Sequence, residues 1–209
     1  MTVRAMTATR RTILCSASAG LLAVTTPLAI AASAPTLTPP LLGDVNAPKR
    51  LVMWGSLTCP FTAMLAVVLK RIVTDMKSVA SLEWRHFPTH PPDPALHVAG
   101  LAFQGEHFWG FAMNVLRAVY NANGDHTALT PTMLAEFARA EGGTQKTLDA
   151  AYADKTKWAA VKADLLAGRL LGVTRTPALF YNGYFMTPDG VPLNLNAFDK
   201  SLREMLAKA

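Results

Sequence analysis

The sequence predicts an α/β fold in which a strand–helix–strand unit is followed by a block of helices, a β-hairpin and a final helix. Three observations support this prediction. A short apolar run at 51–54 and a segment of alternating polarity at 82–87 flank a helical pattern that begins at Pro60. Residues 94–171 carry mainly helical patterns, and 178–186 contain two short apolar runs around an Asn-Gly pair. Two strands joined by such a helix lie parallel in one sheet.

The first 34 residues differ in composition from the rest of the 209-residue chain. They hold three arginines and no acidic residue, residues 13–30 form an apolar stretch rich in Ala, Ser and Thr, and small residues surround Ala31. The three arginines are Arg4, Arg10 and Arg11. This order is typical of a secretory signal peptide, and we expect cleavage after Ala31. The export route stays open, because the Arg10-Arg11 pair resembles a twin-arginine motif but also fits a general secretory signal.

Removal of residues 1–31 changes the charge and the thiol content of the chain. Of the 20 basic residues, 17 remain against 14 acidic ones, so the net charge is about +3, which gives no case for nucleic-acid binding. Of the two cysteines, Cys15 leaves with the signal and Cys59 remains, so the exported protein has one thiol and no internal disulfide. No later apolar run reaches the roughly 18 residues of a membrane span, so we expect no stable membrane insertion after cleavage.

The strand–helix–strand unit follows a proline-rich leader at 35–40. The run 51–54 indicates a buried strand, 55–58 a turn, and the helix then starts at Pro60, where a missing N–H costs nothing. The broad buried face of this helix is predicted from Met64, Val68, Ile72 and Met76, which recur every four residues, with Leu65, Leu69 and Val73 beside them. Residues 82–87 alternate in polarity and end at Pro88, as a second strand would.

The helical block and the last elements complete the pattern. We expect helices at 94–121, broken near Gly105, at 130–140 after the N-cap Thr130, and at 144–171 up to Gly172. Asn182-Gly183 predicts a type I′ hairpin turn, and 198–206 an amphipathic helix. We divide the chain into a signal peptide (1–31), a first core part (42–91), a helical insertion (92–170) and a second core part (171–209).

Four segments of the chain resemble the DsbA family, the branch of the thioredoxin fold with a helical insertion before the cis-proline hairpin. They are Gly43–Pro48, the Thr58-Cys59-Pro60-Phe61-Thr62 stretch, His86-Phe87-Pro88 with the later Gln104–Trp109, and Leu171–Gly183. The resemblance implies thiol-disulfide chemistry at Cys59 and a cis Thr176-Pro177 bond beside the sulfur. It places Pro60, Phe61, Thr176 and Pro177 at the substrate. The sequence departs from the family at Thr62, which stands where the second cysteine of a Cys-Pro-x-Cys motif belongs.

The position of Cys59 before a helix favours a reactive thiolate, because free backbone N–H groups and the helix dipole stabilise negative charge there. We expect the Thr62 hydroxyl to donate to the sulfur, and the peptide groups of Thr176 to pair with an extended substrate. The alternative for Cys59 is an inert buried cysteine. His86 and His90 follow the second strand; they could contact Cys59 or bind metal, or be a half-buried and a loop histidine. We interpret His97 as a helical or loop residue, and the remaining charged residues as solvated surface.

Two functions follow from these residues. The first is a monothiol oxidoreductase or isomerase acting through Cys59 and Thr62, without cofactor or metal, on exported proteins or peptides with thiols or disulfides, or on a small thiol. The second is a non-catalytic peptide-binding module that has lost redox activity. A glutathione-using isomerase of the kappa-type transferase group is a weaker third reading, since such enzymes are not usually exported. The signal peptide predicts a periplasmic or otherwise exported protein.

Overall fold

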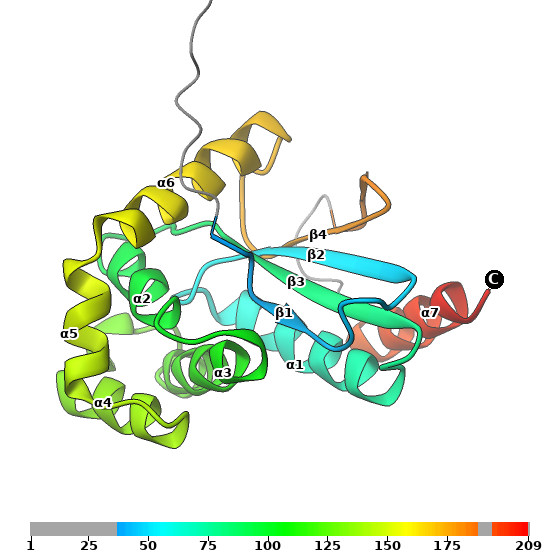
Figure 1. The fold of residues 1–209 in the computed structure, drawn as a ribbon. Coiled ribbons are helices and arrows are strands. Elements are labelled where there is room, and N and C mark those ends of the chain that lie inside the picture. The colour runs from blue at the N-terminus through cyan, green and yellow to red at the C-terminus, as the bar shows by residue number, and fades with distance from the viewer. Residues whose placement is uncertain (1–36, 188–193, 209) are drawn as a thin grey trace, which may run out of the picture. The chain divides into compact units, whose positions relative to one another are not determined.

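The computed structural model describes residues 37–187 and 194–208, so the predicted signal peptide lies outside the described residues. Five strands form one sheet in the order β1-β3-β2-β4-β5 (Figure 1). The strands are β1 (Leu41–Leu42), β2 (Lys49–Gly55), β3 (Ala80–His86), β4 (Ala178–Tyr181) and β5 (Tyr184–Phe185). The β2–β3 pair is parallel, as predicted, and the other pairs are antiparallel.

Helices account for most of the remaining chain. They are α1 (Pro60–Asp75), α2 (Asp93–Gly100), α3 (Gly105–Asn121), a short 3-10 turn η1 (His126–Ala128), α4 (Pro131–Ala140), α5 (Gln145–Ala153), α6 (Lys155–Leu170) and α7 (Leu195–Ala207). The fold is the thioredoxin arrangement with its helical insertion between β3 and β4, as expected. No helix among the described residues is both long and apolar enough to cross a bilayer.

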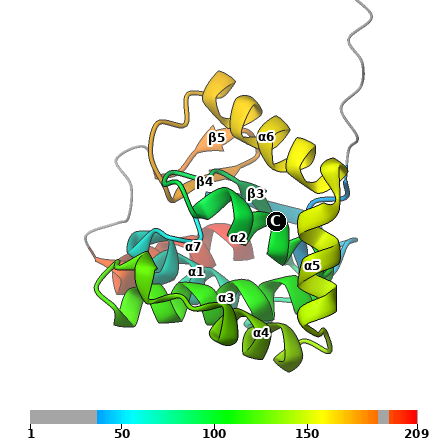
Figure 2. The ribbon, with the colours of Figure 1, turned by 90° about the vertical axis from the view of Figure 1, so that its left-hand side faces the viewer.

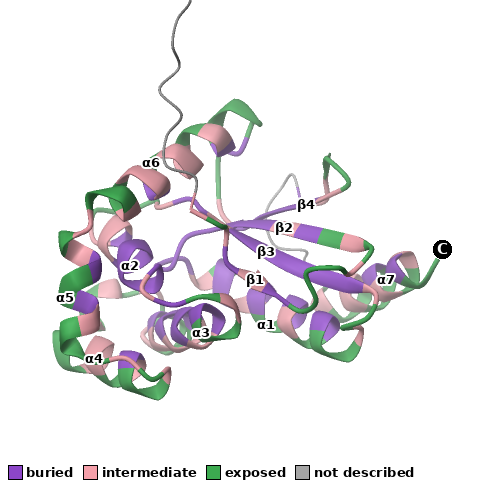
Figure 3. Ribbon diagram, in the orientation of Figure 1, coloured by how far each residue is buried: buried purple, intermediate pink, exposed green. Residues whose placement is uncertain are grey.

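The sheet has a helical layer on each face (Figures 1 and 2). Alternate residues of β2 point to opposite sides, as strand geometry requires. Leu51 and Met53 belong to the main core with α1, α3 and α7, whereas Trp54 packs with Phe87 and Phe180 on the α6 side. Figure 3 shows the buried residues concentrated along the sheet and on the inner faces of α1, α2 and α3. This core fixes α1 against the strand that leads into it.

The structure differs from the sequence prediction in two places. The helical stretch expected at 144–171 is divided into two helices, because Asp154 is extended (φ −82°, ψ 101°) and caps α6 by accepting from the N–H of Thr156 at 2.8 Å. Such a side chain competes with the helix for backbone donors. Strand β1 was not expected after the proline-rich leader; it pairs Leu41 with Glu83 and Leu42 with Leu82. The break near Gly105 is confirmed, since α2 ends at Gly100 and α3 begins at Gly105.

Candidate functional site around Cys59

Cys59 is placed by the end of β2 and the start of α1. After Gly55 the chain makes a buried turn through Ser56, Leu57 and Thr58, and Cys59 is the N-cap residue of α1, with Pro60 as the first helical residue. Proline suits this position because its ring is compatible with the first turn and no N–H is lost from the helix ladder. The sulfur therefore lies at the end of α1 where unpaired N–H groups and the helix dipole favour negative charge.

The loop before β4 brings its backbone to the sulfur. Cys59 Sγ lies 3.4 Å from the carbonyl oxygen of Thr176, to which the thiol donates. The Thr176-Pro177 peptide bond is cis, as the resemblance implied. Within the described part of the chain the structure gives the backbone N–H of Thr176 no hydrogen bond, so a donor for an extended ligand stands beside the sulfur.

The other predicted site residues surround this contact to different extents. Pro60 is half-buried, Phe61 is 57% exposed and Pro177 is buried. Cys59 itself is only 9% exposed. The loop after α3 also reaches the site, because a Cβ on Gly124 would lie 3.5 Å from the Pro60 ring. The structure thus brings Cys59, Pro60, Thr176 and Pro177 together and leaves Phe61 as an exposed apolar side chain at the start of α1.

Thr62 does not make the expected hydrogen bond to the sulfur. Its side chain is fully buried on the core face of α1, and Oγ1 has no hydrogen-bond partner among the described residues. The only hydrogen bond that the structure gives to Cys59 Sγ within those residues goes to Thr176. A bond in which the thiol donates is available to the protonated sulfur alone, so it opposes the preference of the helix N-terminus for thiolate.

The two histidines at and just after the end of β3 have separate environments. His86 is 2% exposed, and its Nδ1 lies 2.8 Å from Nδ1 of His97. Burial, followed by the charges of His97 and Arg85, holds the pKa of His86 well below its usual value. His90 is exposed and stacks on His126, with ring centroids 5.8 Å apart. Among the described residues neither histidine forms a hydrogen bond with Cys59, whose sulfur bonds to Thr176, and no cluster of three metal-ligating side chains occurs in residues 37–187 and 194–208.

Sequence analysis missed the buried polar residues that lie next to the turn 56–58, which precedes Cys59. Asp93 is fully buried instead of lying at the solvated surface, and His97, which lies in helix α2, is fully buried as well. Asp93 Oδ1 accepts from the N–H of Leu57 at 2.9 Å. Burial raises the pKa of Asp93, but His97, Ser56 and Thr89 outweigh this effect, so the pKa lies below its usual value. The i, i+4 spacing of Asp93 and His97 on a predicted helix was the available signal.

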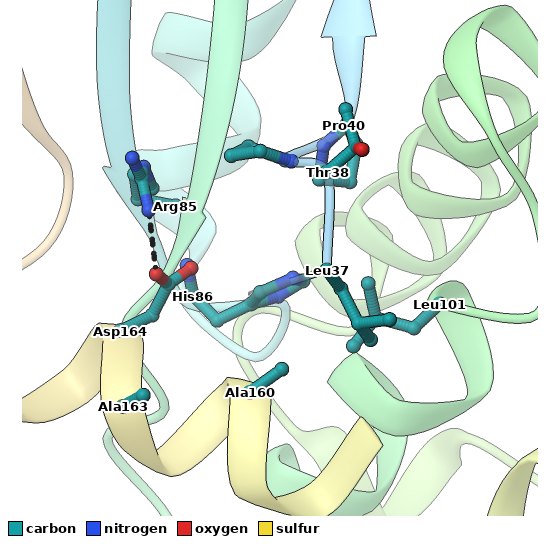
Figure 4. A pocket seen from close by; sticks show the side chains of 10 residues that line it. Leu37, Thr38, Pro40, Arg85, His86, Leu101, Ala160, Ala163 and Asp164 are labelled. Carbon is teal, nitrogen blue, oxygen red and sulfur yellow. Dashed lines mark hydrogen bonds and ion pairs between the residues drawn. The ribbon is translucent and has the colours of Figure 1, made fainter. Parts of the chain in front are cut away.

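A partly buried pair of opposite charges, Arg85 and Asp164, lies on the α6 side of the sheet, away from the Cys59 turn. Asp164 accepts from Arg85 at 2.9 Å and from the N–H of His86 at 3.0 Å. Burial raises the pKa of Asp164 above its usual value, although the N–H of His86 and the charge of Arg85 act in the opposite direction. Figure 4 shows these three residues around a cavity of about 60 Å³ that is also lined by the leader residues 37–40. This cavity is too small for a peptide.

Comparison with known proteins agrees with this geometry. A family model described as Thioredoxin (Thioredoxin_4) matches residues 35–200. The chain belongs to this thioredoxin family. No curated protein sequence matches it. Among solved structures, this thioredoxin-family protein is similar to alpha-DsbA1 from Wolbachia pipientis, with a TM-score of 0.67 and 21% identity, covering 85% of this chain and 95% of that one.

Two further structures share the fold with this thioredoxin-family protein. ScsC from Proteus mirabilis, in a transitional conformation, has a TM-score of 0.65 and 17% identity, with 82% of this chain and 74% of that one covered. A protein-disulfide isomerase from Novosphingobium aromaticivorans has a TM-score of 0.64 and 17% identity, with 81% and 97% covered. These similarities show a DsbA-like thioredoxin fold, including the helical insertion.

Proposed function

We propose that this protein is an exported monothiol oxidoreductase or isomerase of the DsbA-like type, acting through Cys59. The observation that carries the proposal is the position of Cys59 at the N-terminus of α1, 3.4 Å from the carbonyl oxygen of Thr176. The helix end stabilises the attacking thiolate, and the backbone of Thr176 provides a place for an extended peptide. The names of the structural relatives, DsbA and protein-disulfide isomerase, agree with this chemistry.

The reaction needs no cofactor. The Cys59 thiolate attacks one sulfur of a substrate disulfide, the S–S bond of the substrate breaks, and the leaving thiolate takes up a proton from solvent. A mixed disulfide between Cys59 and the substrate remains. A second thiol, from the substrate or from a small molecule, then attacks this bond and releases Cys59 as the thiolate. Substrate disulfides are thereby exchanged or rearranged without net oxidation, which suits a chain that has threonine at position 62.

The substrates in this proposal are exported proteins or peptides with thiols or disulfides, or a small thiol adduct. Export follows from the signal-like residues 1–31, and sequencing of the N-terminus of protein from the native compartment tests it. A mature protein that begins near Ala32 is expected. Soluble cytoplasmic protein with Met1 intact would contradict export.

A second function, peptide binding without redox chemistry, is favoured by one specific observation. Cys59 is only 9% exposed, and its thiol donates to Thr176. A thiol that stays protonated and covered does not attack disulfides, although the backbone of Thr176 could still pair with an extended peptide. Thiolate absorbance followed against pH distinguishes the two functions, because only the enzyme requires a substantial thiolate population near neutral pH.

The decisive experiment compares three variants of the mature chain after mixing with an oxidised peptide. On non-reducing gels, wild type is expected to form a long-lived Cys59 adduct, and Cys59→Ala to form none. Thr62→Cys places a thiol in the same helical turn, so its intramolecular attack is expected to clear the adduct and reduce the peptide. A folded wild type that forms no adduct would favour the binding module. A wild type that turns over as fast as Thr62→Cys would contradict the monothiol mechanism.

A further inference from the structure

A series of contacting, buried polar side chains lies next to the turn 56–58 that precedes Cys59, and within the described part of the chain none of these side chains forms a hydrogen bond with the sulfur. Trp84 Nε1 lies 3.2 Å from His86 Nδ1, and His86 Nδ1 lies 2.8 Å from His97 Nδ1. His97 Nε2 in turn lies 3.3 Å from Asp93 Oδ1. All four side chains are at most 2% exposed. Such a network is costly unless its donors and acceptors match, so its proton positions follow from its geometry.

The donors and acceptors fix these protons. An indole N–H can only donate, so His86 Nδ1 accepts from Trp84 and carries no proton. His97 Nδ1 must then carry the proton of the 2.8 Å contact and donate it to His86. His97 Nε2 faces a carboxylate oxygen, and without a proton there two acceptors would oppose each other at 3.3 Å. Each of these three contacts has one donor and one acceptor when His97 is an imidazolium that faces the Asp93 carboxylate. His86 Nδ1 then accepts from both Trp84 and His97, and the buried Nε2 of His86 has no hydrogen-bond partner among the described residues.

This pair is held by charge more than by an aligned hydrogen bond. The separation of Nε2 and Oδ1 is within ion-pair distance, but the angle is poor, and Nε2 makes no hydrogen bond of good geometry within the described residues. The carboxylate has better-aligned partners elsewhere, because Oδ1 accepts from the N–H of Leu57 and Oδ2 from the N–H of Thr89, both at 2.9 Å. The other charged groups near the network are Arg85 of β3, and Asp164 of α6, which accepts from the N–H of His86.

Asp93 thereby ties the helical insertion to the turn that carries the sulfur. Leu57 is two residues before Cys59, and its neighbour Ser56 accepts from the N–H of Thr58 at 3.3 Å and from the hydroxyl of Thr89 at 3.0 Å. Ser56, Leu57 and Thr58 are all at most 1% exposed. A single carboxylate from the first turn of α2 thus holds both the turn before Cys59 and the loop after β3.

We propose that Asp93 is a positioning residue for Cys59, and that the proton on His97 keeps the Asp93 carboxylate in place to hold the turn. A catalytic consequence of this role depends on the function proposed above, whereas the effect on the position of the sulfur does not. When the pair is broken, the buried turn loses an anchor that is a charged acceptor, and the sulfur is no longer fixed against Thr176. Hydrogen bonds to charged groups are the strong ones, so the effect is expected to exceed that of an ordinary contact.

The test measures the turn and the sulfur separately in the mature chain. Amide hydrogen exchange at Leu57 reports the anchor, and the rate of Cys59 alkylation by iodoacetamide reports the sulfur. In Asp93→Asn we expect protection at Leu57 to fall about tenfold or more, the change that corresponds to one charge-assisted hydrogen bond. We expect the alkylation rate to change by a similar factor. Asp164→Asn is the matched control, because Asp164 is also mostly buried, paired and bonded to a backbone N–H, but holds no residue of the turn.

A comparison with global stability distinguishes positioning from general loss of stability. In Asp93→Asn, Leu57 protection and the alkylation rate are expected to change by more than the free energy of unfolding, measured by urea denaturation, accounts for. His97→Gln keeps a donor near Asp93 but removes the positive charge that faces the carboxylate, so Leu57 protection should fall in this variant too. Asp164→Asn should leave Leu57 protection unchanged. His97→Gln also carries the test if Asp93→Asn does not fold.

Three results would overturn the positioning role. They are unchanged Leu57 protection and alkylation in folded Asp93→Asn, equal effects in Asp164→Asn, and unchanged Leu57 protection in folded His97→Gln. Failure of the proposed function looks different, because wild type would then form no disulfide adduct while the exchange and alkylation measurements still follow Asp93. The two hypotheses are therefore tested independently.

Discussion

The sulfur of Cys59 and the carbonyl oxygen of Thr176 lie 3.4 Å apart, although 117 positions separate the two residues in the chain. The contact joins the N-terminus of α1 to the loop before β4. Strands β2 and β4 are adjacent and antiparallel, and Trp54 lies opposite Ala178. The loop that follows β2 and the loop that precedes β4 therefore lie at the same end of the strands. The sheet pairing therefore assembles the candidate site.

Thr176→Ala tests whether this contact depends on the side chain. The oxygen belongs to the backbone, so alanine retains it, and we expect the rate of Cys59 adduct formation to stay within about twofold of wild type, as for a substitution outside the core. Adduct formation is followed on non-reducing gels, with Cys59→Ala as the blank. A tenfold change would show that the threonine side chain itself takes part.

Thr62→Val tests the cost of the buried hydroxyl. Thr62 Oγ1 is buried without a hydrogen-bond partner among the described residues, and valine keeps the branched shape. We expect the free energy of unfolding to rise by about 1 kcal/mol, since an unsatisfied polar group is removed. Thr58→Val is the matched comparison, because Thr58 Oγ1 lies 3.1 Å from Ser56 Oγ, and its loss is expected to lower stability by about 1 kcal/mol. Urea denaturation measures both, and a destabilised Thr62→Val would show that the hydroxyl has a partner in solution.

Because His86 is buried, we expect the free energy of unfolding to fall in acid. Burial, with the charges of His97 and Arg85, lowers its folded-state pKa well below 6.5, so the folded protein keeps His86 neutral while the unfolded chain gains a proton. The stability contribution is fully present above pH 6.5 and is lost as the pH falls toward the folded pKa. The slope approaches about 1.4 kcal/mol per pH unit. Urea denaturation between about pH 7 and pH 5 measures it.

The His86 prediction has a matched control. His86→Gln should flatten the slope, because glutamine does not titrate. His107→Gln should leave the slope nearly unchanged, since the His107 side chain is 70% exposed and pairs only at the surface with Glu141. Equal slopes in wild type and His86→Gln would show that another group dominates the acid response.

Replacing glycine by alanine is expected to have different effects on stability at Gly168 and at Gly110, both of which lie in helices. Alanine at Gly168 of α6 would bring its Cβ to 2.8 Å from Trp54 and 2.9 Å from Phe87, two rings of the core on that side, so we expect a loss of about 1–3 kcal/mol. Alanine at Gly110 of α3 meets only the movable carboxylate of Glu141, and its better helix propensity offsets that contact. Thermal or urea unfolding ranks the two variants. A Gly168→Ala protein as stable as Gly110→Ala would show that α6 can move away from the sheet.

The order of elements was predictable because it depends on local patterns. Apolar spacing indicated α1, the 130–140 helix appeared as α4 with its Thr130 cap, and Asn182 and Gly183 have the positive φ values, 50° and 78°, that a type I′ turn needs. The errors arose where the local signal was weak. Strand β1 has two residues and exists only through its pairing with β3, and the end of α5 depends on a single capping carboxylate at Asp154.

The sequence by itself predicted that one thiol remains after removal of the signal-like residues 1–31 and that this thiol begins a helix, and it determined that threonine stands three residues after Cys59. Its resemblance to the DsbA family placed Thr176 and Pro177 beside that thiol. Only the tertiary structure decided that Thr62 faces the core without bonding the sulfur, and that Asp93, His97 and His86 are buried beneath the turn. The reason is physical: residue patterns define which face of a helix is apolar, whereas the partner of a buried polar group depends on how α2 packs against the ends of β2 and β3.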